Sequence, residues 1–233
     1  MGRRIESLFL AGPAGRLEAL LEEPEEGAPL ANGPRAAALI CHPHPQHGGT
    51  MHNKVVYRMA RGLRRAGHVA LRFNYRGVNL SEGEYAHGEG ELDDARVALE
   101  FLRERYSDLP FTLAGFSFGS RIALRLGCEI QTSSPARRVI AVGFPTVYPD
   151  RSFLERCTVP RVFVQSTRDE FGPVDELERI AAALPEPKRV VLIDARDHFF
   201  AGALDALEET IAGLQSRPER FIGTCAQIAA CVP

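Results

Sequence analysis

A serine flanked by two glycines is the strongest chemical signal in this sequence. Ser117 lies between Gly115 and Gly119, after the apolar segment 111–116 and before the amphipathic segment 118–127. A tight turn from a strand into a helix has no room for side chains at the two glycine positions, and it raises the serine hydroxyl above the sheet. The pattern predicts a nucleophilic serine at a helix N-terminus, where the helix dipole favours developing negative charge. The alternative is an ordinary Gly-rich turn with an N-capping serine.

A serine hydroxyl becomes a good nucleophile only when a base accepts its proton and an acid orients that base. Of the seven histidines, only His198 follows the last predicted strand, 189–194. Asp169 follows the preceding strand, 161–166, which we expect to lie beside it. The sequence therefore predicts Ser117 as nucleophile, His198 as general base and Asp169 as the acid. Three other carboxylates in the same two loops stay open as alternatives: Glu170, Asp194 and Asp197.

Acyl transfer passes through an oxyanion that needs two backbone N–H donors. The first donor is the residue after the nucleophile, which is Phe118. The second comes from the loop after the first buried strand, in the segment 41–53. Pro43 and Pro45 have no N–H to donate, so His44 is the predicted second donor.

The same loop is rich in histidine, which raises the alternative of a metal site. Its two prolines keep the chain extended and turn successive side chains apart, and no acidic residue in the loop completes a ligand set. We therefore predict no bound metal and no cofactor, and a packing role for His42. The histidines concerned are His42, His44, His47 and His52.

A third loop, 73–84, is dense in turn-forming residues. Its Arg76 is expected to pair with a nearby carboxylate or to cap carbonyl groups, and substrate contact is the alternative. A run of acidic residues is expected to form a solvated face at the start of a helix, where negative charge is favoured. The run consists of Glu82, Glu84, Glu89, Glu91, Asp93 and Asp94.

Short apolar runs alternate with amphipathic segments through most of the chain. Runs of this kind are typical of strands that are covered on both faces. The alternation predicts a mostly parallel, doubly wound α/β sheet of about seven or eight strands, with its ligand site beyond the carboxyl ends of the strands. The predicted strands are 36–41, 69–74, 111–116, 139–144, 161–166 and 189–194. The predicted helices are 52–66, 91–106, 118–127, 174–184 and 201–215.

The two ends of the chain differ from this alternation. Residues 5–24 alternate apolar and polar side chains around a Gly-Pro turn, which predicts an edge hairpin within the N-terminal portion 1–30. Residues 216–233 fit no element and are expected to form a C-terminal tail. We expect residues 1–233 to form a single domain with a minimal cap or none, because the stretch between residues 144 and 161 is short.

The bulk composition is that of an ordinary globular protein. The 233 residues are 45% hydrophobic and 25% charged, with a formal net charge of −2. This balance supplies no concentrated positive field, so a nucleic acid partner is not expected. No apolar run is as long as a signal-peptide core or a membrane span, so we predict a cytoplasmic location without membrane association. The five cysteines show no metal or redox spacing and are expected to be free, mostly buried thiols.

Together these motifs resemble the α/β-hydrolase superfamily, and more narrowly small bacterial serine hydrolases related to dienelactone hydrolases. The likeness covers about residues 5–215 and rests on CHPHPQHGGTMHNKVV, FNYRGVNLSEGEY, GFSFGS, STRDEFGP and RDHFF. It implies a single-domain α/β-hydrolase fold and an esterase-like activity carried by the triad and oxyanion donors named above. Asn79 stands where such proteins commonly have glycine, and an Asn tolerates the left-handed backbone that the turn requires. Dienelactone hydrolases use a cysteine nucleophile, so Ser117 argues against that particular reaction.

The predicted reaction is hydrolysis of a small, accessible carboxylic ester through an acyl-enzyme intermediate. A thioesterase, an amidase or a peptidase would use the same residues, and a non-catalytic binding module is the alternative from another class. The expected partner is therefore a small-molecule ester. The sequence leaves open whether the protein is a monomer or a homodimer.

Overall fold

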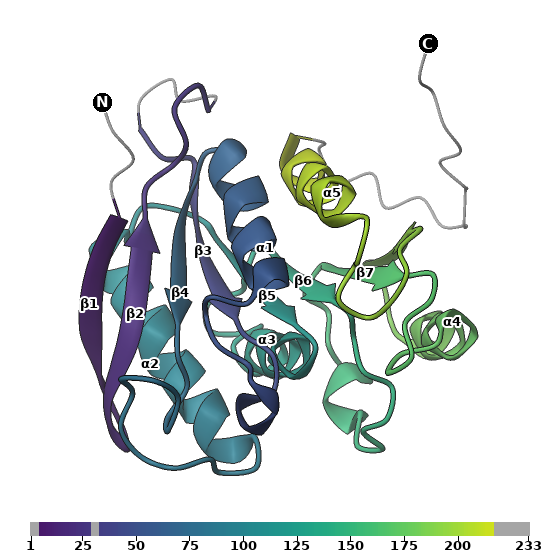
Figure 1. Cartoon of the computed structure of the whole chain (residues 1–233), viewed down its shortest axis with the longest axis horizontal. Coiled ribbons are helices and arrows are strands. Elements are labelled where there is room, and N and C mark those ends of the chain that lie inside the picture. Colours follow the sequence, from purple (N-terminus) through teal and green to yellow (C-terminus); the bar gives the residue numbers. More distant parts are fainter. Residues whose placement is uncertain (1–4, 29–32, 217–233) are drawn as a thin grey trace.

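The computed structural model describes residues 5–28 and 33–216. One sheet runs through the molecule, and Figure 1 shows it with helices on both sides. Its strands are β1 (Ile5–Gly12), β2 (Gly15–Glu22), β3 (Ala36–Cys41), β4 (His68–Phe73), β5 (Phe111–Phe116), β6 (Arg138–Val142), β7 (Arg161–Ser166) and β8 (Lys188–Ile193). The helices are α1 (Lys54–Arg65), α2 (Glu89–Arg105), α3 (Phe118–Glu129), α4 (Val174–Ala183) and α5 (Leu204–Ser216). Every predicted helix and strand is present; β3, β5 and β7 have the predicted ends, and the ends of the others differ by a few residues.

The sheet has eight strands in the order β1-β2-β4-β3-β5-β6-β7-β8. The strands from β3 to β8 pair in parallel, which confirms the mostly parallel sheet. β1 and β2 form the expected antiparallel hairpin, and β2 pairs antiparallel with β4. The chain winds outward from the centre in both directions, so the order reverses between β3 and β5. Ligands of doubly wound sheets bind at such a reversal, beyond the carboxyl ends of the strands.

Two helical layers cover the sheet because its central strands are apolar on both faces. On one face Ile40 and Phe116 belong to a core shared with α1 and α5. On the other face Leu39 and Leu113 belong to a core shared with α2, α3 and α4. Strands β3, β4, β5, β6 and β7 are buried along their whole length. This sandwich of layers holds the carboxyl ends of the parallel strands in one fixed row.

Helices α1 and α5 are also joined by charge. The buried carboxylate of Glu208, on α5, accepts hydrogen bonds from Arg58, Arg61 and Arg65, all on α1. A buried carboxylate is stable only when it is paired in this way. Because α1 follows the loop after β3 and α5 follows the loop after β8, this cluster ties together two segments that border the carboxyl ends of the sheet.

The stretch between β6 and β7 contains no cap. Residues 143–160 include a single short 3-10 helix, η2 (Ser152–Leu154), whose Leu154 is buried. The predicted end of β6 at residue 144 is wrong by two residues, because Gly143 has a φ of +55° and breaks the strand. The predicted tail, 216–233, lies outside the described residues except for Ser216, where α5 ends. No helix in the described part of the chain has the length and apolar character needed to cross a membrane.

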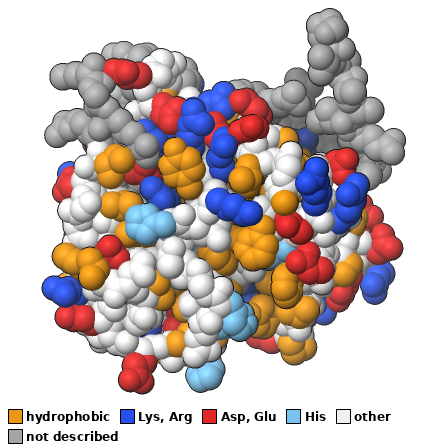
Figure 2. Space-filling model, in the orientation of Figure 1, with side chains coloured by type: hydrophobic (Ala, Val, Ile, Leu, Met, Phe, Trp, Pro, Cys, Tyr) orange, Lys and Arg blue, Asp and Glu red, His pale blue; other side chains and the backbone are white. Residues whose placement is uncertain are grey.

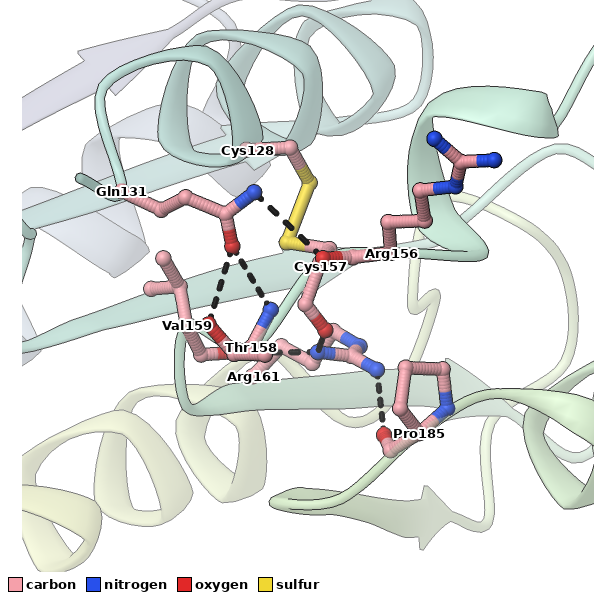
Figure 3. The surroundings of a disulfide bond; sticks show 8 residues. All are labelled: Cys128, Gln131, Arg156, Cys157, Thr158, Val159, Arg161 and Pro185. Carbon is pink, nitrogen blue, oxygen red and sulfur yellow. Dashed lines mark hydrogen bonds between the residues drawn. A yellow bond between two sulfur atoms is a disulfide. The ribbon is translucent and has the colours of Figure 1, made fainter.

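The expectation of free cysteines is wrong for two of the five. Cys128, on α3, and Cys157, just after η2, form a disulfide between positions 29 residues apart, shown in Figure 3. Beside it, Gln131 binds the backbone and the hydroxyl of Thr158, and Arg161 binds three carbonyl oxygens. Spacing along the chain could not reveal the pair, because only the packing of η2 on α3 brings the two sulfurs together.

The remaining cysteines fall into two groups. Cys41 is free and buried at the end of β3, as expected. Burial raises the pKa of its thiol to about 12, so it stays protonated and is a poor nucleophile. Cys225 and Cys231 lie outside the described residues.

The disulfide yields a stability prediction. Opening a loop of this length removes a constraint on the unfolded chain that is worth about 3–4 kcal/mol. Adding a reductant should therefore lower the urea midpoint of the wild-type protein, and the paired variant Cys128→Ala with Cys157→Ala should have the low midpoint with or without reductant. Alkylation of the denatured, unreduced protein should leave Cys128 and Cys157 unmodified; alkylation of both would contradict the bond.

Candidate functional site

Ser117 occupies a strained turn at the junction of β5 and α3. It has φ +55° and ψ −123°, a conformation that non-glycine residues rarely adopt and that costs about 1–3 kcal/mol. Its backbone N–H donates to the carbonyl oxygen of Val142, at the end of β6, over 2.9 Å. The tight strand-to-helix turn predicted from the sequence is therefore present. Ser117 occupies the N-cap position of α3, but its side chain makes no capping hydrogen bond, so the alternative of a capping serine is not supported.

Gly115 and Gly119 make this turn possible. A Cβ atom at Gly115 would overlap the carbonyl group of Gly119, four residues later in the same turn. A Cβ atom at Gly119 would overlap the carbonyl oxygens of Cys41 and His42, at the end of β3. The second contact matters most, because it lets the start of α3 lie directly against the loop that follows the neighbouring strand.

His198 and Asp169 are joined by a buried hydrogen bond. The distance from His198 Nδ1 to Asp169 Oδ2 is 2.7 Å, and both side chains are almost completely buried. The other carboxylate oxygen of Asp169 accepts the N–H groups of Phe171 and Gly172, each at 2.9 Å. These three bonds fix the carboxylate. The carboxylate in turn fixes the imidazole with its proton on Nδ1, which leaves Nε2 able to accept a proton.

The competing carboxylates make other contacts. Glu170 accepts the backbone N–H of His198 over 3.0 Å and does not bind the ring. Asp194 accepts the hydroxyl of Thr167, and Asp197 accepts the backbone N–H of Ala201. Among the described residues, Asp169 is thus the one acid that reaches the imidazole.

The imidazole of His198 lies beside the serine turn. Its ring centroid is 4.9 Å from that of Phe116, the residue before Ser117. Its Cε1 atom is 3.0 Å from the position that a Cβ of Gly143 would take, directly after the strand end that binds the Ser117 N–H. In the described part of the chain the serine hydroxyl makes no hydrogen bond to the ring, a contact that in resting enzymes often closes only with substrate.

The backbone N–H groups of the two expected oxyanion donors have no hydrogen-bond partner in the described part of the chain. Within residues 5–28 and 33–216, neither the N–H of Phe118 nor that of His44 donates a hydrogen bond to a protein group. Phe118 begins α3, so its N–H belongs to the first helical turn, where no partner exists within the helix. The rings of Phe118 and His44 are in contact, with centroids 5.0 Å apart.

The histidine-rich loop does not gather its rings around one point. His42 is fully buried and uses both ring nitrogens, toward the Pro43 carbonyl oxygen and the Tyr75 N–H. His44 accepts the N–H of Gln46 at Nδ1 and contacts the hydroxyl of Tyr85 at Nε2. Burial, and then the charge of the stacked ring of His47, lower the pKa of His44. In the described ranges no group of three or more potential metal ligands comes together.

Hydrogen bonds within the protein hold the loop after β4. Arg76 forms a bidentate ion pair with Asp94, at 2.7–3.1 Å, which confirms the carboxylate pairing. Asn79 has a φ of +50°, the left-handed conformation that its position was expected to require. The acidic run is only partly a solvated face: Glu91 and Asp94 are fully buried, because Glu91 accepts the N–H groups of Ala86 and Gly88 while Asp94 holds Arg76.

Two aromatic side chains that were not singled out from the sequence border the site. The rings of Phe171 and Phe199 both meet the ring of His198 edge to face, at centroid distances of 4.9 and 5.4 Å. They are 45% and 37% exposed, and they form an apolar rim beside His198. Their adjacency to Asp169 and His198 in the sequence was the available signal.

Comparison with known proteins fits this geometry. Residues 35–210 match the family described as the alpha/beta hydrolase domain. An uncharacterised protein from Rickettsia prowazekii is 33% identical over 203 residues, 83% of this chain and 81% of that protein.

Solved structures agree with the family match. A serine hydrolase without a lid from Xanthomonas campestris is 30% identical, with a TM-score of 0.82 over 91% of this chain and 94% of its own. A serine hydrolase homologue from Coxiella burnetii is 32% identical, with a TM-score of 0.81 over 90% of this chain and 96% of its own. The dienelactone hydrolase from Anabaena variabilis, at 18% identity and a TM-score of 0.72 over 91% of this chain and 97% of its own, shares the fold.

The close approach at Gly119 can be tested by one methyl group. Gly119→Ala should lower the free energy of unfolding by about 1–3 kcal/mol, because the new Cβ forces the start of α3 away from β3. Gly213→Ala, on α5 where a Cβ meets no atom of residues 5–28 and 33–216 within 4 Å, is the matched control and should be neutral or slightly stabilising. Equal urea midpoints for the wild type and Gly119→Ala would show that the close approach is not required.

Proposed function

The chain belongs to the α/β-hydrolase domain family, and on that premise we propose that it is a serine hydrolase that cleaves small carboxylic esters. The observation that carries the proposal is the buried hydrogen bond between His198 and Asp169, placed beside the strained turn of Ser117. A fixed imidazole next to an accessible serine hydroxyl is what acyl transfer requires.

In the proposed reaction the Ser117 oxygen attacks the ester carbonyl while His198 Nε2 takes the hydroxyl proton. The resulting oxyanion accepts hydrogen bonds from the N–H groups of Phe118 and His44. His198 then returns the proton to the leaving alcohol, which departs and leaves an acyl-enzyme. A water molecule that His198 deprotonates hydrolyses this intermediate, and the proton passes back to Ser117 as the acid is released. Asp169 stabilises the imidazolium at each proton transfer.

Access to the site supports small substrates. Residues 143–160 form no lid, and the rim beside the base consists of the exposed rings of Phe171 and Phe199. An open site with an apolar rim can hold a short acyl or aryl group but cannot surround a long chain. The same machinery would accept a thioester or an activated amide, so the substrate panel should include them.

The charge of the surface does not favour a nucleic acid partner. On the face drawn in Figure 2, basic and acidic side chains lie intermixed, and the formal net charge of the chain is −2. A nucleic acid partner would need a concentrated positive field. The cytoplasmic location stays a prediction. The disulfide argues against a cytoplasmic location, because such bonds persist mainly in oxidising compartments, although they also occur inside some hyperthermophiles.

The roles of the triad residues can be tested by substitution. Ser117→Ala should abolish hydrolysis of p-nitrophenyl acetate and labelling by a fluorophosphonate probe. Asp169→Asn should lower kcat by about 10³- to 10⁴-fold, because the imidazole loses the acceptor that sets its tautomer. Asp194→Asn, from the competing carboxylate that binds Thr167, is the control and should stay within about twofold of the wild type. Probe labelling that survives in Ser117→Ala would rule out the proposed nucleophile, and a wild type without turnover would favour a binding module.

The open site also predicts a dependence on acyl length. The value of kcat/KM should be highest for p-nitrophenyl acetate or butyrate and should fall for the palmitate ester, because no lid covers a long chain. Each ester is measured beside its thioester on the wild type and on Ser117→Ala. A strong preference for the palmitate ester would contradict the small-substrate proposal and would leave the triad assignment intact.

A further inference from the structure

His42 has a defined hydrogen-bonding arrangement although it lies outside the triad. Its ring is fully buried, with Nε2 3.1 Å from the backbone nitrogen of Tyr75 and Nδ1 2.7 Å from the carbonyl oxygen of Pro43. A backbone N–H can only donate, so Nε2 is the acceptor. The ring proton must therefore be on Nδ1, from which it is donated to the Pro43 carbonyl.

The protonation state and tautomer of the His42 ring do not change near neutral pH. Burial lowers the pKa of His42 to about 3, so the imidazole is neutral near pH 7 and keeps a single tautomer. The ring therefore acts as a permanent donor at one end and a permanent acceptor at the other.

The Pro43 carbonyl and the His44 N–H belong to the same peptide group. The peptide is planar and trans, so its C=O and N–H bonds point in opposite directions, and fixing the oxygen fixes the direction of the N–H. In the described part of the chain no group other than His42 donates to the Pro43 oxygen. On its other side this carbonyl is packed against Gly49, where a Cβ would overlap the oxygen.

We propose that His42 is a positioning residue of the oxyanion hole, which holds the Pro43–His44 peptide so that the His44 N–H faces the carbonyl oxygen of the substrate. The inference rests on the proposed serine-hydrolase function, and it identifies His42 as the residue that orients the second oxyanion donor, the N–H of His44. A hydrogen bond to the carbonyl also polarises the peptide, which strengthens its N–H as a donor to an anion. The same ring anchors the N–H of Tyr75, so the loop after β3 is registered against the loop after β4.

Two amide substitutions test the hydrogen bonds of the two His42 ring nitrogens separately. In His42→Asn the amide nitrogen lies close to the place of Nδ1 and can still donate to Pro43. In His42→Gln the longer side chain reaches the place of Nε2, where it can accept the Tyr75 N–H and leaves Pro43 without its donor. His52→Gln, at an exposed histidine ten positions along the chain, is the control for a general effect on the loop.

The measurement is the ratio of kcat/KM for an ester to that for the matching thionoester, in which sulfur replaces the carbonyl oxygen. Sulfur is larger and accepts hydrogen bonds weakly, so the oxyanion hole favours the ester, and a misaimed donor slows the ester more than the thionoester. We expect His42→Gln to lower the ratio by about 10-fold or more, while His42→Asn and His52→Gln stay within about threefold of the wild type. Active enzyme is counted by fluorophosphonate titration, so a loss of folded protein does not enter the ratio.

Equal ratios in His42→Gln and His42→Asn would overturn the inference and assign His42 to packing alone. If the Gln variant does not fold, the Asn variant decides. Its shorter side chain cannot reach the Tyr75 N–H but can still donate to Pro43. An unchanged ester-to-thionoester ratio in His42→Asn therefore supports the hydrogen bond to Pro43 as the one that orients the His44 N–H. A fall of 10-fold or more in that ratio overturns the inference. A wild type that hydrolyses neither compound and is not labelled at Ser117 would instead defeat the proposed function itself.

Discussion

The close approach of two backbones at the centre of the sheet is the constraint on which the candidate site depends. Gly119 lies against the carbonyl oxygens of Cys41 and His42 with no side chain between them. Strands β3 and β5 are neighbours at the point where the winding of the sheet reverses. The segments that follow them can therefore contact each other only if the start of α3 has no side chain at the point of contact. This contact sets the start of α3 beside the loop after β3, where the rings of Phe118 and His44 are 5.0 Å apart, and no rotation of side chains could replace it.

Near this contact, the side chains of Asp169 and His42 have a hydrogen-bond partner at each polar atom. Asp169 is held by two N–H groups and one imidazole, and His42 by one N–H and one carbonyl. Because an unpaired polar group in the interior costs free energy, such bonds leave each side chain a single stable position. The chemistry we propose needs this rigidity, since the barrier to acyl transfer falls only when donors are already in place before charge develops.

Two expectations failed for a common reason. Glu91 and Asp94 are buried although they lie in a run of acidic residues, because the loop after β4 folds back and offers them N–H groups and a guanidinium. Cys128 and Cys157 are paired because η2 packs on α3. In both cases the partner is distant in the sequence or lies in an irregular loop, and neither periodicity nor spacing carries information about such contacts.

The sequence by itself determined the elements, the mostly parallel sheet and the identity of the residues proposed for chemistry, because hydrophobic periodicity and the Gly-x-Ser-x-Gly turn are local properties of the chain. It left four carboxylates as candidates for the acid, since all of them follow neighbouring strands. Only the tertiary structure decided that Asp169 reaches the ring of His198 while Glu170 binds its backbone. Only packing, likewise, placed the ring of His42 on the peptide of His44, because a hydrogen bond depends on direction and the order of residues does not specify it.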